Sequence, residues 1–260
     1  MKALTENLRR VWIFDFDGTL SPIVAERSAA RMLPEAKKTL TELNHLPGQQ
    51  VAVLSSRMLD DLISRVRVPG TYLGGGSGIE WLLPDGRRTR AEESLEPLLK
   101  AREATIPRID YLKAIPGVDV EDKTWSVAVH VRRVMQDDRA SVFGLLTDMA
   151  RTGSIRILKG PEVFEIQLLP EIDKLLGVRA LCRLIRFDPG SGMIVYCGDD
   201  ENDAVAMEWV IRQGGVAFSI GFHPLVPGAR PVDGPEGLVR EIRKWACMGK
   251  GEVRRKHERL

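Results

Sequence analysis

Two carboxylates spaced two residues apart, Asp15 and Asp17, follow a short apolar run near the start of the chain. The run, Val11 to Phe14, is rich in β-favouring residues, which predicts a buried strand with the acids at its carboxyl end. In an open parallel sheet, ligands bind at that end. Two carboxylates this close together are costly to bury unless a cation or hydrogen bonds compensate. The alternative is a strand followed by an acidic turn, because Asp-Gly is common turn chemistry.

Three further segments carry polar side chains after a predicted strand or at the start of a predicted helix. They hold Ser55, Ser56 and Arg57; Lys174; and Asp199, Asp200, Asn202 and Asp203. Because parallel strands point the same way, the loops that follow them are expected to converge on one edge of the sheet. The shared site would combine several carboxylates with a hydroxyl and an ammonium group.

This combination suits transfer of a phosphoryl group. A phosphate ester is anionic and repels a nucleophile, so Mg²⁺ is needed to screen its charge and align it. Asp15 is the predicted nucleophile, which would form an aspartyl-phosphate, and Asp17 would protonate the leaving alkoxide and later activate water. Asp15, the main-chain carbonyl of Asp17 and Asp199 would supply the oxygen ligands that a hard cation prefers.

Other residues of these segments are predicted to hold the phosphate and to support the metal ligands. Ser55 and Lys174 would bind phosphate oxygens, and spacing alone leaves Ser56 as an alternative to Ser55. Thr19, which follows the two acids, is a further catalytic candidate. The residues expected to orient the metal ligands and waters are Asp200, Asn202 and Asp203.

The composition is that of an ordinary globular protein with one large domain or a core with an inserted module. The 260 residues are 43% hydrophobic and 28% charged, and a net charge of +2 indicates no strongly charged partner such as nucleic acid. Three widely spaced cysteines favour a reducing compartment over a disulfide framework. The sequence shows no signal peptide or bilayer-spanning stretch, so we expect a cytoplasmic protein. The basic end Lys250–Leu260 is expected in solvent, as are Lys2, Arg9 and Arg10.

To bring the polar segments together, the chain needs a parallel sheet with helices on both faces. Four runs are predicted as its buried strands: Val11–Phe16, Gln50–Leu54, Met193–Cys197 and Gly215–Ser219. The helical patterns are Pro34–Leu46, Leu59–Arg65, Ile172–Ile185, Asp203–Arg212 and Pro235–Trp245. This alternation predicts an α/β fold with a doubly wound, Rossmann-like parallel-sheet core.

Residues from Tyr72 to about Leu169 break that rhythm with hairpin signals. Trp125–Val131 alternates with period two, and IRILKGPEVFEIQLL is a strand–turn–strand pattern. With helices expected near Glu93–Ala104 and Asp137–Thr152, the segment predicts an α+β cap domain inserted into the core. The expected boundaries are core residues 1–78 and 170–260, cap residues 79–169, and hinges at Leu73–Gly78 and around Leu169–Ile172.

The order of the motifs resembles that of the haloacid dehalogenase superfamily of phosphatases. The DxDGT pattern at Asp15–Thr19, a downstream serine, a distant lysine and GDDxxD at Gly198–Asp203 occur in the same order. The resemblance implies a core of the haloacid dehalogenase type and a phosphatase that uses Mg²⁺.

A finer resemblance, over nearly the whole chain, is to the trehalose-6-phosphate phosphatase family. FDFDGTLSPI resembles that family's DYDGTLxPI, VLSSR its VSGR segment and GGSGIE its GSHGLE. EDK followed by AVHVR resembles ExK…LHYR of the cap, EIQLLPEIDKL resembles EvrP…DKG, and GDDEND resembles GDDxTDE. The departures are Ser77 in place of histidine, Ser56 and Leu175 in place of glycine, and Asn202-Asp203-Ala204 in place of Thr-Asp-Glu.

The resemblance implies substrate-binding roles for residues of the cap and of the second motif region. Those of the cap are Glu121, Lys123, His130 and Glu165, and those of the core are Arg57, Gly76 and Ser77. Alternatively, the charged cap residues lie on a solvated face of a hairpin and do not contact substrate. For His130, packing against a neighbouring strand is as good an explanation as contact with substrate. Arg57 would either cap the next helix or touch substrate.

Together these features predict an Mg²⁺-dependent phosphomonoesterase for a disaccharide phosphate, with trehalose 6-phosphate as the leading substrate. The alternative is a phosphatase for another glycosyl phosphate, such as mannosyl- or glucosyl-3-phosphoglycerate, because Asn202 before Asp203 is closer to the GDxxND of such enzymes. A sugar-phosphate-binding regulatory domain would lack some of the acids, all of which are present. A phosphomutase fits the GDDEND segment less well. The expected partners are the sugar phosphate and a glycosyl-phosphate synthase, with no membrane or nucleic acid, in a monomer or small homo-oligomer.

Overall fold

The computed structural model describes residues 9–24, 26–90, 95–152, 155–160 and 162–246. Lys2, Cys247 and the basic end Lys250–Leu260 lie outside the described residues. The chain divides into two compact units, which we call the core unit (Met1–Arg90 with Asp173–Leu260) and the inserted unit (Ala91–Ile172). Within the described residues, every helix is too short or too polar to cross a membrane.

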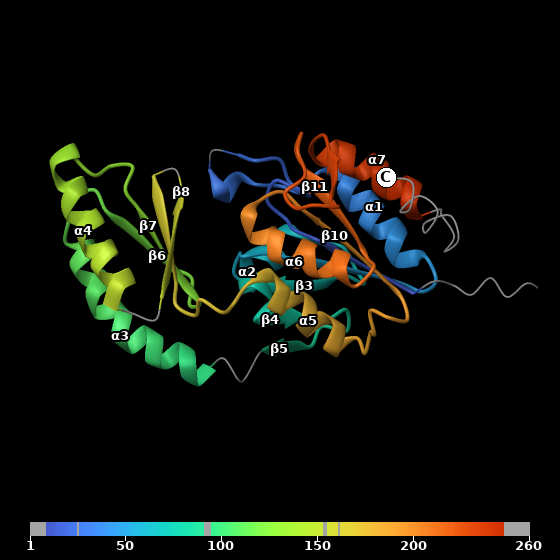
Figure 1. Cartoon of the computed structure of the whole chain (residues 1–260), viewed down its shortest axis with the longest axis horizontal. Coiled ribbons are helices and arrows are strands. Elements are labelled where there is room, and N and C mark those ends of the chain that lie inside the picture. Colours follow the sequence, from blue (N-terminus) through green and yellow to red (C-terminus); the bar gives the residue numbers. More distant parts are fainter. Residues whose placement is uncertain (1–8, 25, 91–94, 153–154, 161, 247–260) are drawn as a thin grey trace, which may run out of the picture. The chain divides into compact units, whose positions relative to one another are not determined.

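The core unit is built on one eight-stranded sheet with the strand order β12-β11-β10-β1-β2-β3-β4-β5 (Figure 1). Neighbouring strands from β12 to β3 run parallel, whereas β4 and β5 join antiparallel. The strands are β1 (Arg10–Phe14), β2 (Gln49–Leu54), β3 (Tyr72–Gly75), β4 (Glu80–Leu82), β5 (Arg88–Arg90), β10 (Met193–Gly198), β11 (Val216–Ile220) and β12 (Arg230–Val232). The predicted α/β fold with a doubly wound parallel sheet is confirmed.

Helices cover both faces of this sheet because successive residues of its central strands point in opposite directions. Trp12 and Phe14 pack in one apolar core with residues of α1, α2 and α7. Val11 and Ile13 pack in a second core with residues of α5 and α6. These helices are α1 (Pro34–His45), α2 (Leu59–Arg65), α5 (Lys174–Leu184), α6 (Glu201–Arg212) and α7 (Gly234–Ala246), and two short 3-10 turns are η1 (Arg27–Ala29) and η2 (Gly76–Gly78). With both faces covered, the charged side chains near the central strands lie at or just beyond the strand ends.

The inserted unit is a four-stranded antiparallel sheet in the order β6-β7-β9-β8, with helices α3 and α4 on one face (Figure 1). Its elements are α3 (Leu95–Lys113), β6 (Asp119–Asp122), β7 (Ser126–His130), α4 (Gln136–Thr152), β8 (Arg156–Gly160) and β9 (Val163–Gln167). In β7, Val127, Ala128 and Val129 are all buried, whereas the residues at its two ends are partly exposed. The predicted strand–turn–strand pattern is confirmed as the β8–β9 pair.

The glycine-rich run Leu73–Gly78, expected as a hinge between domains, instead belongs to β3 and η2 of the core unit. A Cβ on Gly74 would lie 2.8 Å from the ring of Trp81, and one on Gly75 would lie 2.5 Å from the Leu59 backbone. These glycines therefore permit close packing. The hairpin that follows continues the core sheet as β4 and β5, so the division from the inserted unit lies after Arg90 and not after residue 78.

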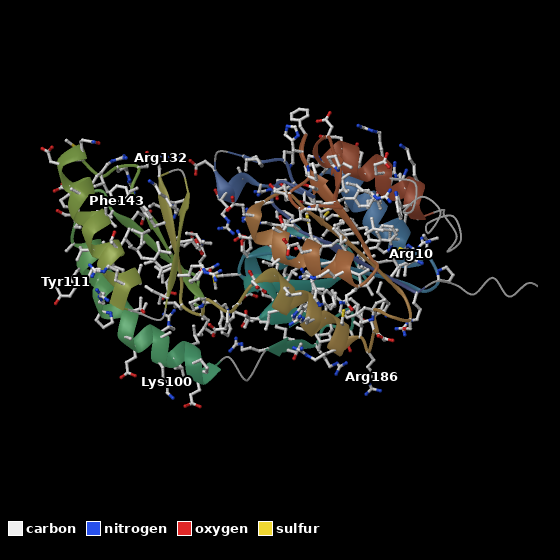
Figure 2. All side chains as sticks on the ribbon, in the orientation of Figure 1. Arg10, Lys100, Tyr111, Arg132, Phe143 and Arg186 are labelled. Carbon is white, nitrogen blue, oxygen red and sulfur yellow. The ribbon has the colours of Figure 1, made fainter. Side chains whose placement is uncertain are left out.

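Arg10, expected in solvent, is a buried residue at the start of β1 (Figure 2). Its Nη1 donates to the main-chain oxygen of Trp245, in α7, at 3.0 Å. The guanidinium thereby stabilises the carboxyl end of that helix, where unpaired carbonyls carry negative partial charge. Arg9 is exposed, as expected.

Candidate active site

The carboxyl ends of three neighbouring strands meet at one edge of the core sheet. β1 lies between β10 and β2, and Phe14, its last residue, is in register with Cys197 on one side and Val53 on the other. The Asp15 amide donates to the Cys197 carbonyl at 2.8 Å. The loops that follow the three strands therefore leave the sheet side by side, which is the convergence expected of parallel strands.

Lys174, the first residue of α5, is buried between two carboxylates. Its Nζ donates to Asp15 Oδ1 at 2.7 Å and to Asp203 Oδ1 at 2.6 Å, and all three side chains are at most 6% exposed. Burial alone would lower the pKa of Lys174, but the two carboxylates outweigh it and raise that pKa. Burial raises the pKa of Asp15 well above its usual range, against the attraction of Lys174.

Asp203 is a fully hydrogen-bonded carboxylate at the start of α6. Its Oδ1 accepts from Lys174 and, at 2.7 Å, from Tyr196 Oη. Its Oδ2 accepts from the amides of Asp199 and Asp200 at 3.1 and 3.2 Å. All four lone-pair sites of the carboxylate are thus used by the protein. Sequence reasoning missed Tyr196, and the only available signal was a polar group inside the apolar run of β10.

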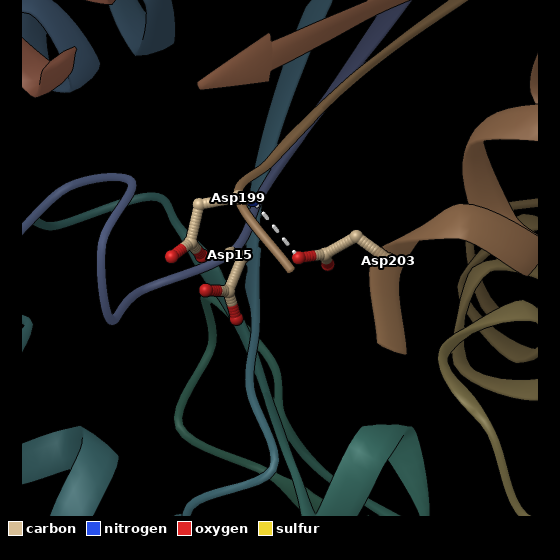
Figure 3. Close-up of side chains that lie close together, drawn as sticks. All are labelled: Asp15, Asp199 and Asp203. Atoms are coloured by element: carbon tan, nitrogen blue, oxygen red, sulfur yellow. Dashed lines mark hydrogen bonds between the residues drawn. The ribbon is translucent and has the colours of Figure 1, made fainter. Parts of the chain in front are cut away.

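The carboxylates of Asp15, Asp199 and Asp203 form a cluster in which one oxygen of each lies within 4.8 Å of the others. Figure 3 shows Asp15 and Asp199 next to each other, while Asp203 bonds to the Asp199 amide. Burial, followed by the charges of Asp203 and Asp200, raises the pKa of Asp199 to about 7. Gly18 allows this approach, because a Cβ there would lie 1.9 Å from Asp199 Oδ2, and its φ of +75° suits glycine.

The cluster suits a hard cation that binds oxygen ligands. Asp203 has no lone pair to spare, and Lys174 occupies only Oδ1 of Asp15. Asp15 and Asp199 are therefore the carboxylates that could hold the ion. Burial, together with neighbouring carboxylates, raises the pKa of both groups, and a bound cation would stabilise their charged forms.

Asp17 is bound by an arginine, whereas Asp15 is bound by Lys174. Arg57 donates Nε to Asp17 Oδ2 at 2.7 Å and Nη2 to Asp17 Oδ1 at 2.6 Å. Thr19, two residues later, is 1% exposed, and its hydroxyl has no hydrogen-bond partner among the described residues. A buried hydroxyl without a partner is uncommon and fits a group that meets a ligand.

The loop after β2 distinguishes the two serines of the second motif. Ser55 is buried, and its Oγ accepts from the Arg57 amide at 3.2 Å. Ser56 is exposed, and its Oγ accepts from Arg27 at 3.3 Å. Burial at the sheet edge favours Ser55 over Ser56 as the phosphate ligand.

The turn η2 is attached to this loop through the backbone. The Ser77 amide donates to the Ser55 carbonyl at 2.9 Å, and the Gly76 amide donates to the Arg57 carbonyl at 2.8 Å. Ser77 has a φ of 59°, in the left-handed region that disfavours most side chains. The structure thus places the segment with the histidine-to-serine departure directly beside the second motif.

Asp200 and Asn202 serve the start of α6. Asp200 is its N-cap, and its carboxylate accepts from the Asn202 amide at 2.9 Å and from Asn202 Nδ2 at 3.2 Å. Both residues are exposed. Their observed contacts fix the loop that carries Asp199.

The four predicted substrate residues of the inserted unit lie on or beside neighbouring strands of its sheet. Glu121 and Glu165 are both in register with Ala128, so the two acids share a face. Lys123 is buried and donates to Glu165 at 2.7 Å, and Ser126 donates to the other oxygen of Glu165. His130 Nε2 lies 3.7 Å from Glu121. The structure thus joins these residues into two pairs within the unit.

Comparisons with known proteins agree with this architecture. A family model described as Trehalose-phosphatase matches residues 13–233. A trehalose-phosphate phosphatase of Mycobacterium avium is 37% identical over 205 residues, which are 78% of this chain and 51% of that protein. The chain spans about half the length of the curated relatives it matches.

Solved structures show the same fold at low sequence identity. A structure titled trehalose-6-phosphate phosphatase related protein has a TM-score of 0.71 and 15% identity, with 91% of this chain and 96% of that chain covered. A haloacid dehalogenase-like hydrolase from Bacteroides thetaiotaomicron has a TM-score of 0.61 and 14% identity, covering 91% and 99%. The chain therefore shares its fold with this haloacid dehalogenase-like hydrolase.

Proposed function

This chain belongs to the trehalose-phosphatase family, and we propose that it removes the phosphate from trehalose 6-phosphate by way of an aspartyl-phosphate. The observation that carries the proposal is the buried contact of Lys174 with Asp15, beside Asp199. This contact places a carboxylate nucleophile, the ammonium group of Lys174 and a second carboxylate together at the end of the central strands. Phosphoryl transfer needs these three groups.

In the proposed reaction, a carboxylate oxygen of Asp15 attacks phosphorus and the bond to the sugar oxygen breaks. Asp17 gives its proton to that oxygen, so the sugar leaves as an alcohol. Asp17 then takes a proton from water, which attacks phosphorus and breaks the bond to Asp15. Inorganic phosphate is released, and both acids return to their starting forms.

The phosphate oxygens need donors and positive charge while the reaction proceeds. We propose that Lys174 and the buried Ser55 hold these oxygens, and that the unpartnered hydroxyl of Thr19 donates to them as well. Mg²⁺ would be held by Asp15, Asp199 and the main-chain carbonyl of Asp17, and would screen the charge of the phosphate.

Trehalose 6-phosphate is the proposed substrate because the family model and the residues quoted for the family agree over most of the chain. A glycosyl-3-phosphoglycerate remains the second candidate, since Ser77 replaces histidine next to the second motif and Asn202 precedes Asp203. We also propose that the Lys123–Glu165 pair of the inserted unit contributes to recognition of the sugar.

A cytoplasmic location fits the two described cysteines, because Cys182 and Cys197 are buried free thiols. We propose that the sugar phosphate comes from a glycosyl-phosphate synthase in the same compartment.

The test is phosphate release, with Mg²⁺, from trehalose 6-phosphate, sucrose 6-phosphate, mannosyl- and glucosyl-3-phosphoglycerate and glucose 6-phosphate. We expect the highest kcat/KM with trehalose 6-phosphate and no activity in Asp15→Asn protein. Preference for a glycerate conjugate would keep the mechanism and change the substrate. If the protein binds the metal but releases phosphate from none of these substrates, the proposal that it is a phosphatase is contradicted.

A further inference from the structure

Arg57, directly after β2, is a buried arginine that contacts two carboxylates. Its side chain is 3% exposed, and it binds both oxygens of Asp17 through Nε and Nη2. Nη1 donates to Asp61 Oδ2 at 2.6 Å, and Nη2 also donates to the Arg27 carbonyl at 2.7 Å. Four hydrogen bonds to acceptors of the protein itself thus occupy most of the five N–H groups of a guanidinium.

Asp61, in the first turn of α2, is held in turn by a second arginine. Arg65 donates Nε and Nη2 to Asp61 Oδ1 at 3.0 and 2.7 Å. Its Nη1 donates to the carbonyls of Ser28 and Ala30 at 3.1 and 2.7 Å. Partial burial of Asp61 would raise its pKa, but the bonds from Arg65 and Arg57 outweigh this and lower the pKa to about 2. We call Arg57, Asp61 and Arg65 the arginine brace.

The brace leaves Asp17 able to react. The Asp17 side chain is 38% exposed, in contrast to the buried Arg57. A carboxylate oxygen has two lone pairs, and the planar fork of Arg57 uses one on each oxygen. The fork therefore fixes the plane of the carboxylate while the remaining lone pairs stay free to carry a proton.

We propose that Arg57 is a positioning residue for Asp17, with Asp61 and Arg65 holding Arg57 in place, and that it does not bind the substrate. This inference rests on the proposed function, in which Asp17 protonates the leaving sugar oxygen. Arg57 has few donors left for a ligand, and its contacts explain its burial without one.

The importance of a positioned Asp17 depends on the leaving group of the substrate. A sugar alkoxide is a poor leaving group and needs a proton from Asp17 as the bond breaks. Dinitrophenolate is stable without a proton, so its departure depends little on how Asp17 is placed. A loss of positioning should therefore slow hydrolysis of a sugar phosphate far more than hydrolysis of dinitrophenyl phosphate.

The experiment compares kcat/KM for both substrates, with Mg²⁺, in wild type, Arg57→Lys and Asp61→Asn. Lysine keeps the charge but loses the two-point contact, and asparagine keeps the shape of Asp61 but loses its charge. Asp60→Asn is the matched control, because Asp60 neighbours Asp61 on α2 but is exposed and bonds to Arg88. Melting temperatures show whether each variant is folded.

We expect Arg57→Lys to lose about 100-fold with the sugar phosphate, within the range that a positioned general acid supplies, and little with dinitrophenyl phosphate. Asp61→Asn should also lose more kcat/KM with the sugar phosphate than with dinitrophenyl phosphate, by a smaller factor. If Arg57→Lys fails to fold, the result for Asp61→Asn decides the test. Equal losses on both substrates in a folded variant would overturn the inference while leaving the phosphatase intact. Wild-type protein inactive on both substrates would refute the proposed function, and the inference with it.

Discussion

At the scale of single residues, the site depends on opposite charges that compensate one another out of water. Lys174 has two carboxylate partners within hydrogen-bond distance, and none of the three side chains has appreciable contact with solvent. Removing one member of such a group leaves the others as uncompensated buried charges. Lys174 is therefore expected to matter for folding as well as for phosphate binding.

We predict that Lys174→Gln lowers the free energy of unfolding by about 3–5 kcal/mol, the usual cost of breaking a buried ion pair from one side. Urea denaturation of the folded protein measures this change. Adding Asp15→Asn should recover part of the lost stability, because only one of the two carboxylates that Lys174 bonds then remains charged. A Lys174→Gln variant as stable as wild type would show that the carboxylates do not depend on the lysine.

Asp199 gives the site a pH dependence. With a pKa of about 7, raised by burial and by Asp203 and Asp200, this group is partly protonated at neutral pH when no metal is bound. A cation must displace that proton. As the pH rises toward this pKa, the Mg²⁺ affinity should therefore increase about tenfold per pH unit, and above the pKa it should level off. Calorimetric titration at several pH values measures the affinity and the protons released. An affinity that does not change across this range would contradict the prediction.

At the scale of elements, the sequence predicted most of what positions the chemistry. The four core strands and the helices that follow them begin and end within a few residues of expectation, because each is a strongly apolar run or a clear helical pattern. β3 and β12 were missed as parallel strands, since each is short and contains or borders glycine or proline. The β4–β5 hairpin contains the turn signal Pro84-Asp85-Gly86, but a local pattern cannot indicate which sheet a hairpin joins.

Contacts between distant residues explain the remaining differences. The pairing of Arg57 with Asp17 joins residues 40 apart in the sequence, and Tyr196 reaches Asp203 from inside a strand. Arg10 was expected in solvent because charged residues usually are, yet a helix end more than 200 residues away accepts its hydrogen bond. No periodicity or spacing encodes such pairs.

The contact between α5 and η2 is close enough to exclude a side chain. A Cβ on Gly177, in α5, would lie 2.5 Å from the Ser77 carbonyl oxygen. We predict that Gly177→Ala lowers the melting temperature, because this backbone atom cannot move without shifting Ser77. Gly144→Ala in α4 is the control, since nothing lies within 4 Å of its Cβ and alanine favours a helix by about 0.5–1 kcal/mol. Stabilisation of both variants would contradict the packing argument.

At the scale of the whole molecule, the two units offer different chemistry. The core unit holds the acids that we propose to react and Lys174, which we propose to bind the phosphate that every candidate substrate shares. The inserted unit holds the paired Lys123 and Glu165 on its sheet. The proposed division of labour assigns catalysis to the first unit and choice of sugar to the second.

We predict that Glu165→Gln lowers kcat/KM for trehalose 6-phosphate by about tenfold, the effect of losing one hydrogen bond to a charged group, and leaves aryl phosphate hydrolysis nearly unchanged. Steady-state kinetics on both substrates tests this. Glu162→Gln, on an exposed residue paired with Arg139, is the matched control in the same unit. An equal loss of kcat/KM on both substrates would contradict a role for Glu165 in selecting the sugar.

In the proposed reaction the phosphate passes through Asp15, and the most direct test is to trap it there. Rapid acid quench of protein mixed with trehalose 6-phosphate carrying radiolabelled phosphate, followed by peptide mapping, locates any covalent label. We expect label on the peptide that contains Asp15, at a site that is sensitive to hydroxylamine, and none in Asp15→Asn protein. Active wild-type protein with no label, or with label on another residue, would contradict it.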